Sequence, residues 1–389
     1  MSFSVRTIVL LGAFGLIIGS IIALESTKPA RVSSSAQKAM PARDAGSSSS
    51  RAASMAVKEK AARYQLAPEI ASPAGFINTT LMDSGQTTPI TISELIGKKV
   101  ILVDFWTYSC INCQRTTPYL NAWYEKYKDK GLEIIGVHTP EFEFEKKYEN
   151  VLAAVKKFNI TYPVVQDNGY ATWTAYKNRY WPRKYLIDID GFIVYDHIGE
   201  GGYEETEKKI QELLEERMVV FNMEGAIAKD IAKPQGISDV DASKPRSPEI
   251  YFGSGRNEYL GNGKQKTSGA QTLIEPVRVK TNALYMAGTW QFEPEFAENT
   301  SAGSKIIFRY QGRDVYFVAS ADSDVKIKIL KDGKPLGLEA GEDVDTESST
   351  VTVREDRLYK LIEDSSYGEH TLEMIIESPG LRAFTFTFG

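Results

Sequence analysis

Two cysteines stand three residues apart at the start of a helical segment, and they constrain the fold of this chain more than any other feature. Cys110 and Cys113 are the only cysteines among 389 residues, so no structural disulfide can form without using one of them. The preceding residues, 100–105, are almost entirely apolar, which is typical of a parallel strand covered on both faces. The pair therefore marks a strand-to-helix junction, and it is either a redox couple or half of a metal site.

A metal site is the weaker of these two hypotheses. A tetrahedral zinc site needs four ligands, and the sequence offers only His138, His197 and His370 as histidine ligands beside the cysteines. None of these histidines has the short spacing found in zinc motifs. We therefore expect no metal and no separate cofactor, because the redox-active group is a Cys110–Cys113 disulfide.

The strand-to-helix junction suits thiol chemistry. A cysteine is nucleophilic as the thiolate, and the free N–H groups at a helix N-terminus stabilise negative charge. Cys113 lies one helical turn after Cys110, so it can attack a mixed disulfide formed there and release the substrate. Cross-linking so short a loop adds little stability, which argues against a purely structural disulfide.

Residues 64–218 are predicted to form an α/β domain with a mixed sheet flanked by helices. The hydrophobic pattern predicts strands at 100–105, 132–137, 162–165, 184–189 and 192–198, and helices at 110–130, 143–159 and 204–216. Gly131 is placed to end the first helix. Asp190-Gly191 is a strong hairpin signal between the last two strands.

The segment from Asp104 to Cys113 resembles the active-site segment of thioredoxins. By this resemblance, Asp104 would take up or relay the proton of Cys113, and Trp106 would pack beside the site. Pro182 matches the cis-proline of that family, which leaves the preceding backbone free to pair with substrate. We therefore predict a cis bond between Trp181 and Pro182, although most bonds before proline are trans.

Further motifs make the resemblance more specific. Residues 105–113, 136–142, 178–182 and 199–203 together resemble the extracytoplasmic part of DipZ-type proteins and the membrane-tethered, TlpA-like thiol reductases of cytochrome c maturation. The resemblance implies a thiol:disulfide oxidoreductase that reduces exported protein disulfides. It also implies a separate membrane electron-transfer protein as the electron donor.

Two departures from these families leave the direction of electron flow open. Ile-Asn stands between the cysteines instead of the Gly-Pro of general thioredoxins, and the redox potential depends on this dipeptide. Thr116 stands three residues after the second cysteine, where cytochrome-type reductases often carry an acidic residue. Glu141 follows the second strand, where it either supplies a carboxylate near the site or caps the next helix.

The N-terminal residues carry a membrane-targeting pattern. Residues 8–24 contain no charge and follow Arg6, and a run of this length is at the short end of a membrane-spanning helix. A cleaved signal peptide is the alternative. We predict that residues 1–25 are an uncleaved signal anchor and that the rest of the chain faces the extracytoplasmic side, in a periplasm or at the cell exterior. Residues 26–63, rich in Ser, Ala and Lys, are expected to form a flexible linker.

The C-terminal part is predicted to be a polar linker at 219–248, followed by an all-β sandwich or jelly roll at 249–389. Short runs separated by turn signals predict strands at 306–310, 315–319, 325–330, 351–353, 358–362, 371–376 and 383–388. This region resembles the appended domain of DipZ-type proteins, which looks like a carbohydrate-binding module. Sugars stack on exposed aromatic rings, so the candidate ligand residues are Trp290, Tyr251, Tyr285 and Tyr310. A protein-docking or spacer role is the alternative.

Two other functions remain as alternatives. Thr107 has the peroxiredoxin spacing to Cys110, but Val103 stands where that family has proline, so a thiol peroxidase is the second hypothesis. The third is a surface-binding or scaffold protein with a vestigial cysteine pair. Nucleic-acid binding is not expected, because the net charge is −5 and no basic stripe is present.

Overall fold

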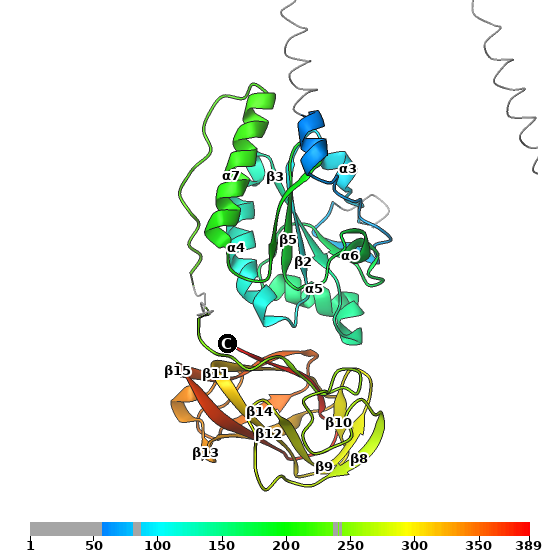
Figure 1. Cartoon of the computed structure of the whole chain (residues 1–389), viewed down its shortest axis with the longest axis vertical. Coiled ribbons are helices and arrows are strands. Elements are labelled where there is room, and N and C mark those ends of the chain that lie inside the picture. Colours follow the sequence, from blue (N-terminus) through cyan, green and yellow to red (C-terminus); the bar gives the residue numbers. More distant parts are fainter. Residues whose placement is uncertain (1–56, 81–86, 236–239, 241–242) are drawn as a thin grey trace, which may run out of the picture. The chain divides into compact units, whose positions relative to one another are not determined.

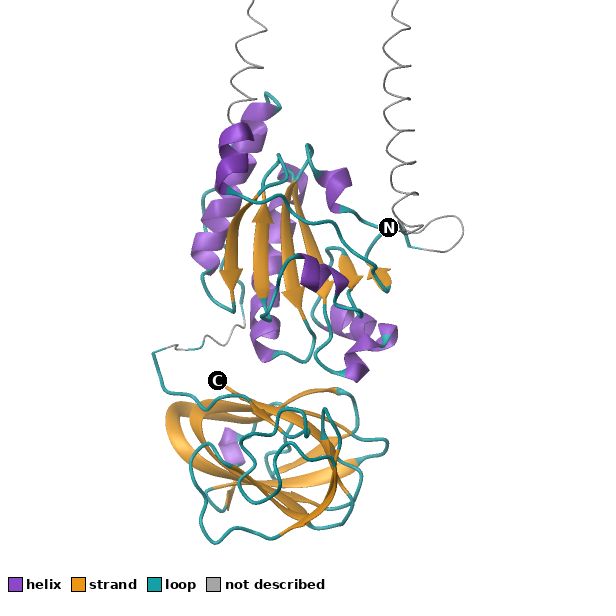
Figure 2. Cartoon of the chain, turned by 45° about the vertical axis from the view of Figure 1, so that its right-hand side comes forward, coloured by secondary structure: helices purple, strands orange, loops and turns teal. Residues whose placement is uncertain are grey.

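A six-stranded mixed sheet in the order β1-β4-β3-β2-β5-β6 forms the N-terminal part of the structure (Figure 1). Its inner strands β2, β3 and β4 run parallel, whereas β1, β5 and β6 pair antiparallel to their neighbours. The strands are β1 (Gly75–Ile77), β2 (Val100–Trp106), β3 (Leu132–His138), β4 (Val164–Gln166), β5 (Arg183–Ile187) and β6 (Ile193–Ile198). The helices around the sheet (Figure 2) are α3 (Ile92–Leu95), α4 (Ile111–Tyr127), α5 (Tyr148–Lys157), α6 (Ala171–Ala175) and α7 (Tyr203–Val220).

Strand β2 is buried along its whole length and organises this sheet. Successive side chains of a strand point to opposite faces. Leu102 and Trp106 share one hydrophobic cluster with residues of α4, α5 and α7, whereas Ile101 and Phe105 share another with residues of α3 and α6. The prediction of a strand covered on both faces is confirmed.

The computed structural model describes residues 57–80, 87–235, 240 and 243–389, and all of them belong to one compact unit. The predicted signal anchor at 1–25 lies outside the described residues, as does most of the predicted flexible linker. No helix within the described ranges is long and apolar enough to cross a membrane.

The predicted helix at 143–159 is interrupted in the structure. A 3₁₀ helix, η2 (Glu143–Lys146), is separated from α5 by Lys147, whose backbone is extended. Glu145 causes this break, because its carboxylate accepts the backbone N–H groups of Glu141 and Phe142 and so folds the segment back on itself. The first predicted helix likewise ends as α4 at Tyr127, and a short 3₁₀ turn follows before Gly131, whose φ of 106° ends it.

Both predicted linkers are partly structured. Residues 57–63, assigned to a flexible linker, are helical. Lys60 in that helix forms ion pairs with Asp188 at 2.8 Å and Glu216 at 2.6 Å, which attach it to the sheet domain. The segment after α7 returns along that helix, where the backbone N–H of Ala232 donates to Glu207 at 2.7 Å. These corrections arise because polar sequence can still be fixed by ion pairs and hydrogen bonds that composition does not reveal.

The C-terminal part is a single hydrogen-bonded sheet built on two long strands, β11 and β15, which pair antiparallel over most of their length. The strands are β7 (Ile250–Tyr251), β8 (Gly269–Leu273), β9 (Leu284–Phe292), β10 (Ala297–Asn299), β11 (Ser304–Ser320), β12 (Val325–Lys331), β13 (Lys334–Pro335), β14 (Thr350–Val353), β15 (Arg357–Ile376) and β16 (Arg382–Phe388). A short 3₁₀ helix, η3 (Gly337–Glu339), follows β13.

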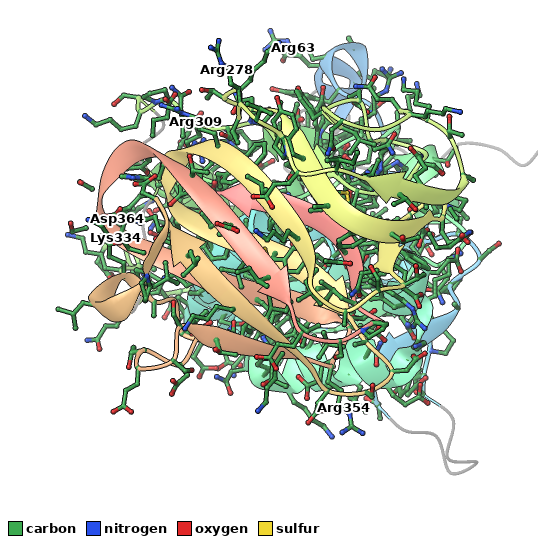
Figure 3. The ribbon with its side chains drawn as sticks, turned by 90° about the horizontal axis from the view of Figure 1, so that it is seen from below. Arg63, Arg278, Arg309, Lys334, Arg354 and Asp364 are labelled. Atoms are coloured by element: carbon green, nitrogen blue, oxygen red, sulfur yellow. The ribbon has the colours of Figure 1, made fainter. Side chains whose placement is uncertain are left out.

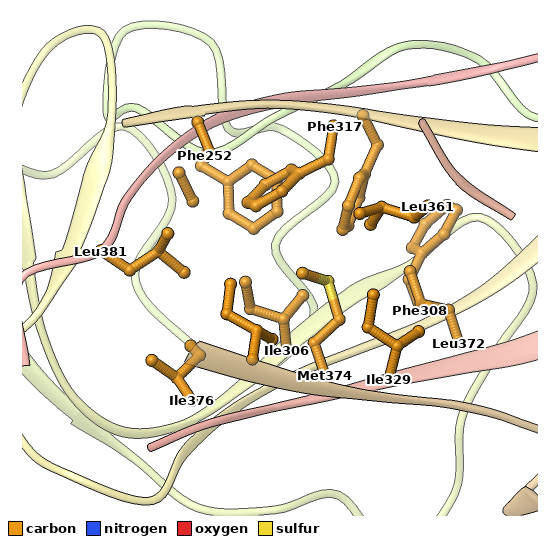
Figure 4. Close-up of a cluster of buried hydrophobic side chains, with 14 of the residues drawn as sticks. Phe252, Ile306, Phe308, Phe317, Ile329, Leu361, Leu372, Met374, Ile376 and Leu381 are labelled. Atoms are coloured by element: carbon orange, nitrogen blue, oxygen red, sulfur yellow. The ribbon is translucent and has the colours of Figure 1, made fainter. Parts of the chain in front are cut away.

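This sheet folds over its own core. β11 pairs with β9 through its first half and with β16 through its second half, and β10 joins β9 to β16. A shift of register between Gly312 and Asp314 bends β11 between these halves. Apolar side chains from the strands and the adjoining loops point toward one another inside the fold (Figure 4), among them Phe252, Ile306, Phe317, Leu361, Met374 and Leu381.

The predicted strands are therefore present, but they are joined differently. The strands predicted at 306–310 and 315–319 are one strand, β11, and those at 358–362 and 371–376 are one strand, β15. The residues between the predicted strands continue the pairing of β11 with β15, as in Gly312 with Gly368 and Asp314 with Glu363. Instead of two sheets, the β-rich region forms one continuous sheet.

The two parts of the chain share a hydrophobic cluster. Phe384 of β16 lies with its ring centroid 5.0 Å from that of Phe142 and 4.9 Å from that of Phe144, both in the segment after β3. Tyr316 and Leu358 of the β-rich region belong to the same cluster. The β-rich region is therefore packed against the segment that leads into η2.

Candidate active site

The two cysteines occupy the junction between β2 and α4. Cys110 is the N-cap residue of α4, and it is partly exposed. Cys113 lies one turn further and is 2% exposed. Both thiols are free. Burial raises the pKa of the Cys113 thiol well above its usual value, and the neighbouring Cys110 and Asp104 raise it further. The sulfur of Cys110 is thus accessible, whereas that of Cys113 is buried behind it.

Asp104 and Lys184 form a buried pair beneath the cysteines. They are direct partners across the antiparallel pairing of β2 and β5, and they are 2% and 1% exposed. Burial raises the pKa of Asp104 to about 7, although the positive charge of Lys184 opposes this shift. Burial also lowers the pKa of Lys184. No hydrogen-bond partner from the described residues reaches Asp104 Oδ1.

Replacing Asp104 by asparagine is expected to flatten the pH dependence of the free energy of unfolding. The pKa of Asp104 is about 7 in the folded protein and about 3.9 in an unfolded chain. Between these values the folded protein keeps a proton that the unfolded chain has released. Wild-type stability therefore falls as the pH rises through this window, by up to about 1.4 kcal/mol per pH unit, and asparagine removes this contribution.

Urea unfolding at several pH values between about 4.5 and 6.5 measures this slope. Asp129→Asn is the matched control, because Asp129 is exposed in the structure and should leave the slope unchanged. Identical slopes for wild type and Asp104→Asn would contradict a protonated carboxyl group at this position.

Pro182 begins the turn into β5, and the Trp181–Pro182 bond is cis, which confirms that prediction. The indole N–H of Trp181 donates to the carbonyl of Thr139 at 3.0 Å, and its ring lies 4.3 Å from that of Trp173. Gly199 N–H donates to the carbonyl of Pro182 at 2.8 Å. These contacts hold the cis-proline turn in place beside the cysteines.

Glu145, which no sequence pattern indicated, is a fully buried carboxyl group next to the site. Its Oε1 accepts hydrogen bonds from the hydroxyl of Ser109 at 2.6 Å and from the Ser109 backbone N–H at 3.3 Å. Burial raises the pKa of Glu145 to about 7, and its hydrogen bonds counteract that shift. Glu145 therefore anchors the residue that precedes Cys110. Charged residues at 143–147 look like a solvated helix face, so no pattern signalled this role.

The aromatic and imidazole groups around the loop are structural. His138 is fully buried, and burial lowers its pKa to about 3, so it stays neutral at ordinary pH. Tyr108 stacks on it with ring centroids 5.7 Å apart, and its hydroxyl donates to the carbonyl of Asp356 at 3.1 Å. Trp106 packs edge-on against the other side of His138, at 5.1 Å. Trp106 thus lies beside the active-site loop, where the sequence placed it.

Glu141 faces the β-rich region. Its carboxylate accepts a hydrogen bond from Tyr251 Oη at 2.8 Å and forms an ion pair with Arg256 at 2.7 Å. The guanidinium of Arg256 lies 3.7 Å from the centre of the Tyr251 ring. Glu141 lines the same cavity as Cys110, and it is Glu145 that accepts the backbone N–H groups at the start of the following segment.

These groups surround one cavity of about 670 Å³. Cys110, Glu141 and Trp181 line it from the α/β domain, and Tyr251 and Arg256 line it from the β-rich region. The accessible sulfur therefore opens into a space that both parts of the chain enclose.

Three of the four predicted sugar-stacking rings are not available to a ligand. Trp290 and Tyr310 are 0% exposed and Tyr285 is 6% exposed. Trp290 donates its indole N–H to the carbonyl of Ala287 at 2.9 Å inside the β-rich core. This prediction was wrong for these residues, because aromatic side chains that alternate inward along a strand fill the core. Tyr251 lines the cavity beside Cys110.

Comparison with known families matches both parts of the chain. The family described as Redoxin matches residues 65–214. The family described as thioredoxin-like C-terminal domain matches residues 247–389. The protein DipZ of Mycobacterium bovis is 36% identical over 326 residues, which cover 83% of this chain and 43% of DipZ. The chain thus spans less than half the length of that relative.

Two smaller relatives are covered over more than four fifths of their length. The thiol-disulfide oxidoreductase YkuV of Bacillus subtilis is 31% identical over 127 residues, which cover 33% of this chain and 85% of YkuV. The thiol-disulfide oxidoreductase ResA of Bacillus cereus is 33% identical over 148 residues, which cover 36% of this chain and 83% of ResA. In both cases, the matched share of this chain is about the size of its α/β domain.

Proposed function

This chain belongs to the thioredoxin-like thiol-disulfide oxidoreductases, and from that membership we propose that it exchanges its Cys110–Cys113 dithiol with the disulfides of other proteins. One observation carries the proposal. Cys110 is partly exposed at a cavity, whereas Cys113 is 2% exposed one turn behind it. A substrate reaches only the first sulfur, and the second is kept for resolving the intermediate.

Exchange begins when the Cys110 thiolate attacks one sulfur of the substrate disulfide. The substrate S–S bond breaks, a Cys110–substrate disulfide forms, and the departing sulfur takes up a proton. Cys113 then loses its proton and attacks the Cys110 sulfur, which closes the Cys110–Cys113 disulfide and releases the second substrate thiol. Two electrons and two protons pass from the dithiol to the substrate.

Asp104 serves as the proton acceptor for Cys113 in this scheme. Because burial raises the pKa of Cys113, that thiol needs a base before it can attack. Asp104, with a pKa of about 7, titrates near neutral pH. Lys184 stabilises the negative charge that moves between these groups, since its charge interacts with both the carboxyl group and the thiol.

We further propose that the chain acts as a reductase of exported protein disulfides, including those met in cytochrome c maturation. A signal anchor at 1–25 would hold it on the extracytoplasmic side, and a separate membrane electron-transfer protein would return electrons to its disulfide. The motif resemblance in the α/β domain supports this assignment, as does the identity with DipZ across both parts of the chain.

The midpoint potential of the Cys110/Cys113 couple tests the direction of transfer. We expect a value near or below about −250 mV, in the thioredoxin range. The expectation rests on the resemblance of the Asp104–Cys113 segment to the active-site segment of thioredoxins. The full chain is equilibrated in thiol–disulfide buffers, and its dithiol fraction is measured by alkylation and mass analysis.

A value near about −120 mV, typical of strong periplasmic oxidants, would make the chain a disulfide donor and would overturn the reductase assignment. No redox transition at all would overturn exchange itself. Rapid consumption of hydrogen peroxide by the reduced chain would instead favour a thiol peroxidase.

A further inference from the structure

The cavity beside Cys110 carries an excess of positive charge. Among its lining residues are four cationic side chains and two carboxylates: Arg179, Lys244, Arg246 and Arg256, with Glu141 and Glu249. The whole chain has a net charge of −5. The positive balance is therefore a local property of the site and does not follow from the overall composition.

The two carboxylates are already engaged within the cavity wall. Glu141 binds Arg256 at 2.7 Å. Tyr251 Oη lies 2.8 Å from Glu141 Oε1 and 2.9 Å from Glu249 Oε2. Arg256 in turn lies over the Tyr251 ring. Glu141 and Arg256 compensate each other, so Glu249 is the one carboxylate of the cavity wall without a cationic partner among the described residues.

Those remaining cations lack close carboxylate partners. Arg179 and Lys244 have no ion pair or side-chain hydrogen bond with any residue that the structure describes, and both are exposed. Arg246 approaches only Glu200, at 4.0 Å, and Glu200 lies closer to Arg115, at 3.3 Å. Three cations thus lie with one unpaired carboxylate, Glu249, in the cavity that holds the accessible sulfur, and the balance there is positive.

We propose that Arg179, Lys244 and Arg246 form a subsite for the carboxylate of an acidic residue next to the reacting cysteine of a polypeptide substrate. Arginine and lysine bind carboxylates through charge-assisted hydrogen bonds, and a charged cleft attracts substrates of opposite sign. Two of the three residues precede β7, so the segment leading into the β-rich region selects the substrate. The proposal rests on the proposed function and adds the substrate class to it.

The occupant is a polypeptide because of what else lines the cavity. Tyr180 and Trp181, the residues before the cis-proline, border the same space as Cys110. A peptide held along that backbone brings the residues that flank its cysteine within reach of the cationic wall. A volume of about 670 Å³ lies within the range of specific ligand pockets.

Three peptides with the same internal disulfide test the proposal, with aspartate, asparagine or lysine beside each cysteine. The second-order rate constant for reduction by the full reduced chain is measured for each at low salt. We expect the aspartate peptide to react about 10-fold faster than the asparagine peptide, and the lysine peptide to react more slowly than both. The differences should shrink at about 0.5 M salt, where charges are screened.

A double variant, Lys244→Gln with Arg246→Gln, should bring the aspartate-to-asparagine ratio close to one. The matched control is Arg278→Gln with Lys334→Gln, which removes the same charges from the β-rich region. Both control residues are exposed, project outward (Figure 3) and do not line this cavity. The control should keep the wild-type ratio, and thermal unfolding checks that both variants fold.

The outcomes separate this proposal from the function on which it rests. Equal rate constants of the wild-type chain for all three peptides would overturn the acidic subsite and leave disulfide exchange intact. A full aspartate preference in the Lys244→Gln, Arg246→Gln variant would do the same. Failure to reduce any of the peptides would overturn the proposed function itself.

Discussion

The Cys110→Ser variant is expected to lose thiol–disulfide exchange, with a fall in rate of at least roughly 10³-fold. Cys110 lines the cavity, and Cys113 is only 2% exposed, so no second thiol can take over the attack. A serine hydroxyl does not replace a thiolate in this reaction. The release of thiols from a peptide disulfide by the pre-reduced full chain measures the effect.

Cys113→Ser is the matched variant, because it keeps the attacking sulfur and removes the resolving one. It is expected to accumulate a covalent Cys110–substrate disulfide, visible by intact mass under non-reducing conditions. A trapped intermediate in Cys110→Ser, but not in Cys113→Ser, would reverse the assigned roles. Undiminished function of the Cys110→Ser variant would instead support a scaffold with a vestigial cysteine pair.

Phe384→Ala is expected to lower the free energy of unfolding by about 3–5 kcal/mol. Phe384 is 3% exposed and packs on Phe142 and Phe144. Truncation leaves a cavity where the β-rich region meets the segment after β3. The backbone around this cavity is held in place by the two sheets, so it cannot readily collapse into the space. Urea unfolding of the full chain, followed by tryptophan fluorescence, measures the loss.

Phe221→Ala is the control for this change, since the Phe221 side chain is 44% exposed at the end of α7. Its effect should stay within about 0.5 kcal/mol. A loss below about 1 kcal/mol for Phe384→Ala would contradict a shared core. Separate transitions for the α/β domain and the β-rich region in the wild type would contradict it as well.

The reactive pair could be identified from local sequence, because local spacing determines its geometry. Two residues between Cys110 and Cys113 place both sulfurs on one turn of α4. The apolar run before them, buried on both faces, places Asp104 on the same side of β2 as Trp106. The cis bond before Pro182 was predicted from the motif resemblance, which encodes a tertiary relationship in a short segment.

The partners of these residues could not be identified in this way. Lys184 faces Asp104 only because β5 pairs with β2 in that register, 80 residues further along the chain. The one available signal for this partner was the charged Lys184 directly before the apolar residues of β5. Glu145 and Arg256 reach the site through contacts that no periodic pattern encodes.

In the β-rich region, the positions of several strands could be predicted from the sequence, since alternation of apolar residues is a local property. It did not determine their pairing, and so it could not place Trp290, Tyr285 and Tyr310 in the core. That this region forms one wall of the Cys110 cavity emerges from the folded chain alone. Reactivity here depends on spacing within one helical turn, whereas charge and access around the sulfur depend on side chains from distant segments.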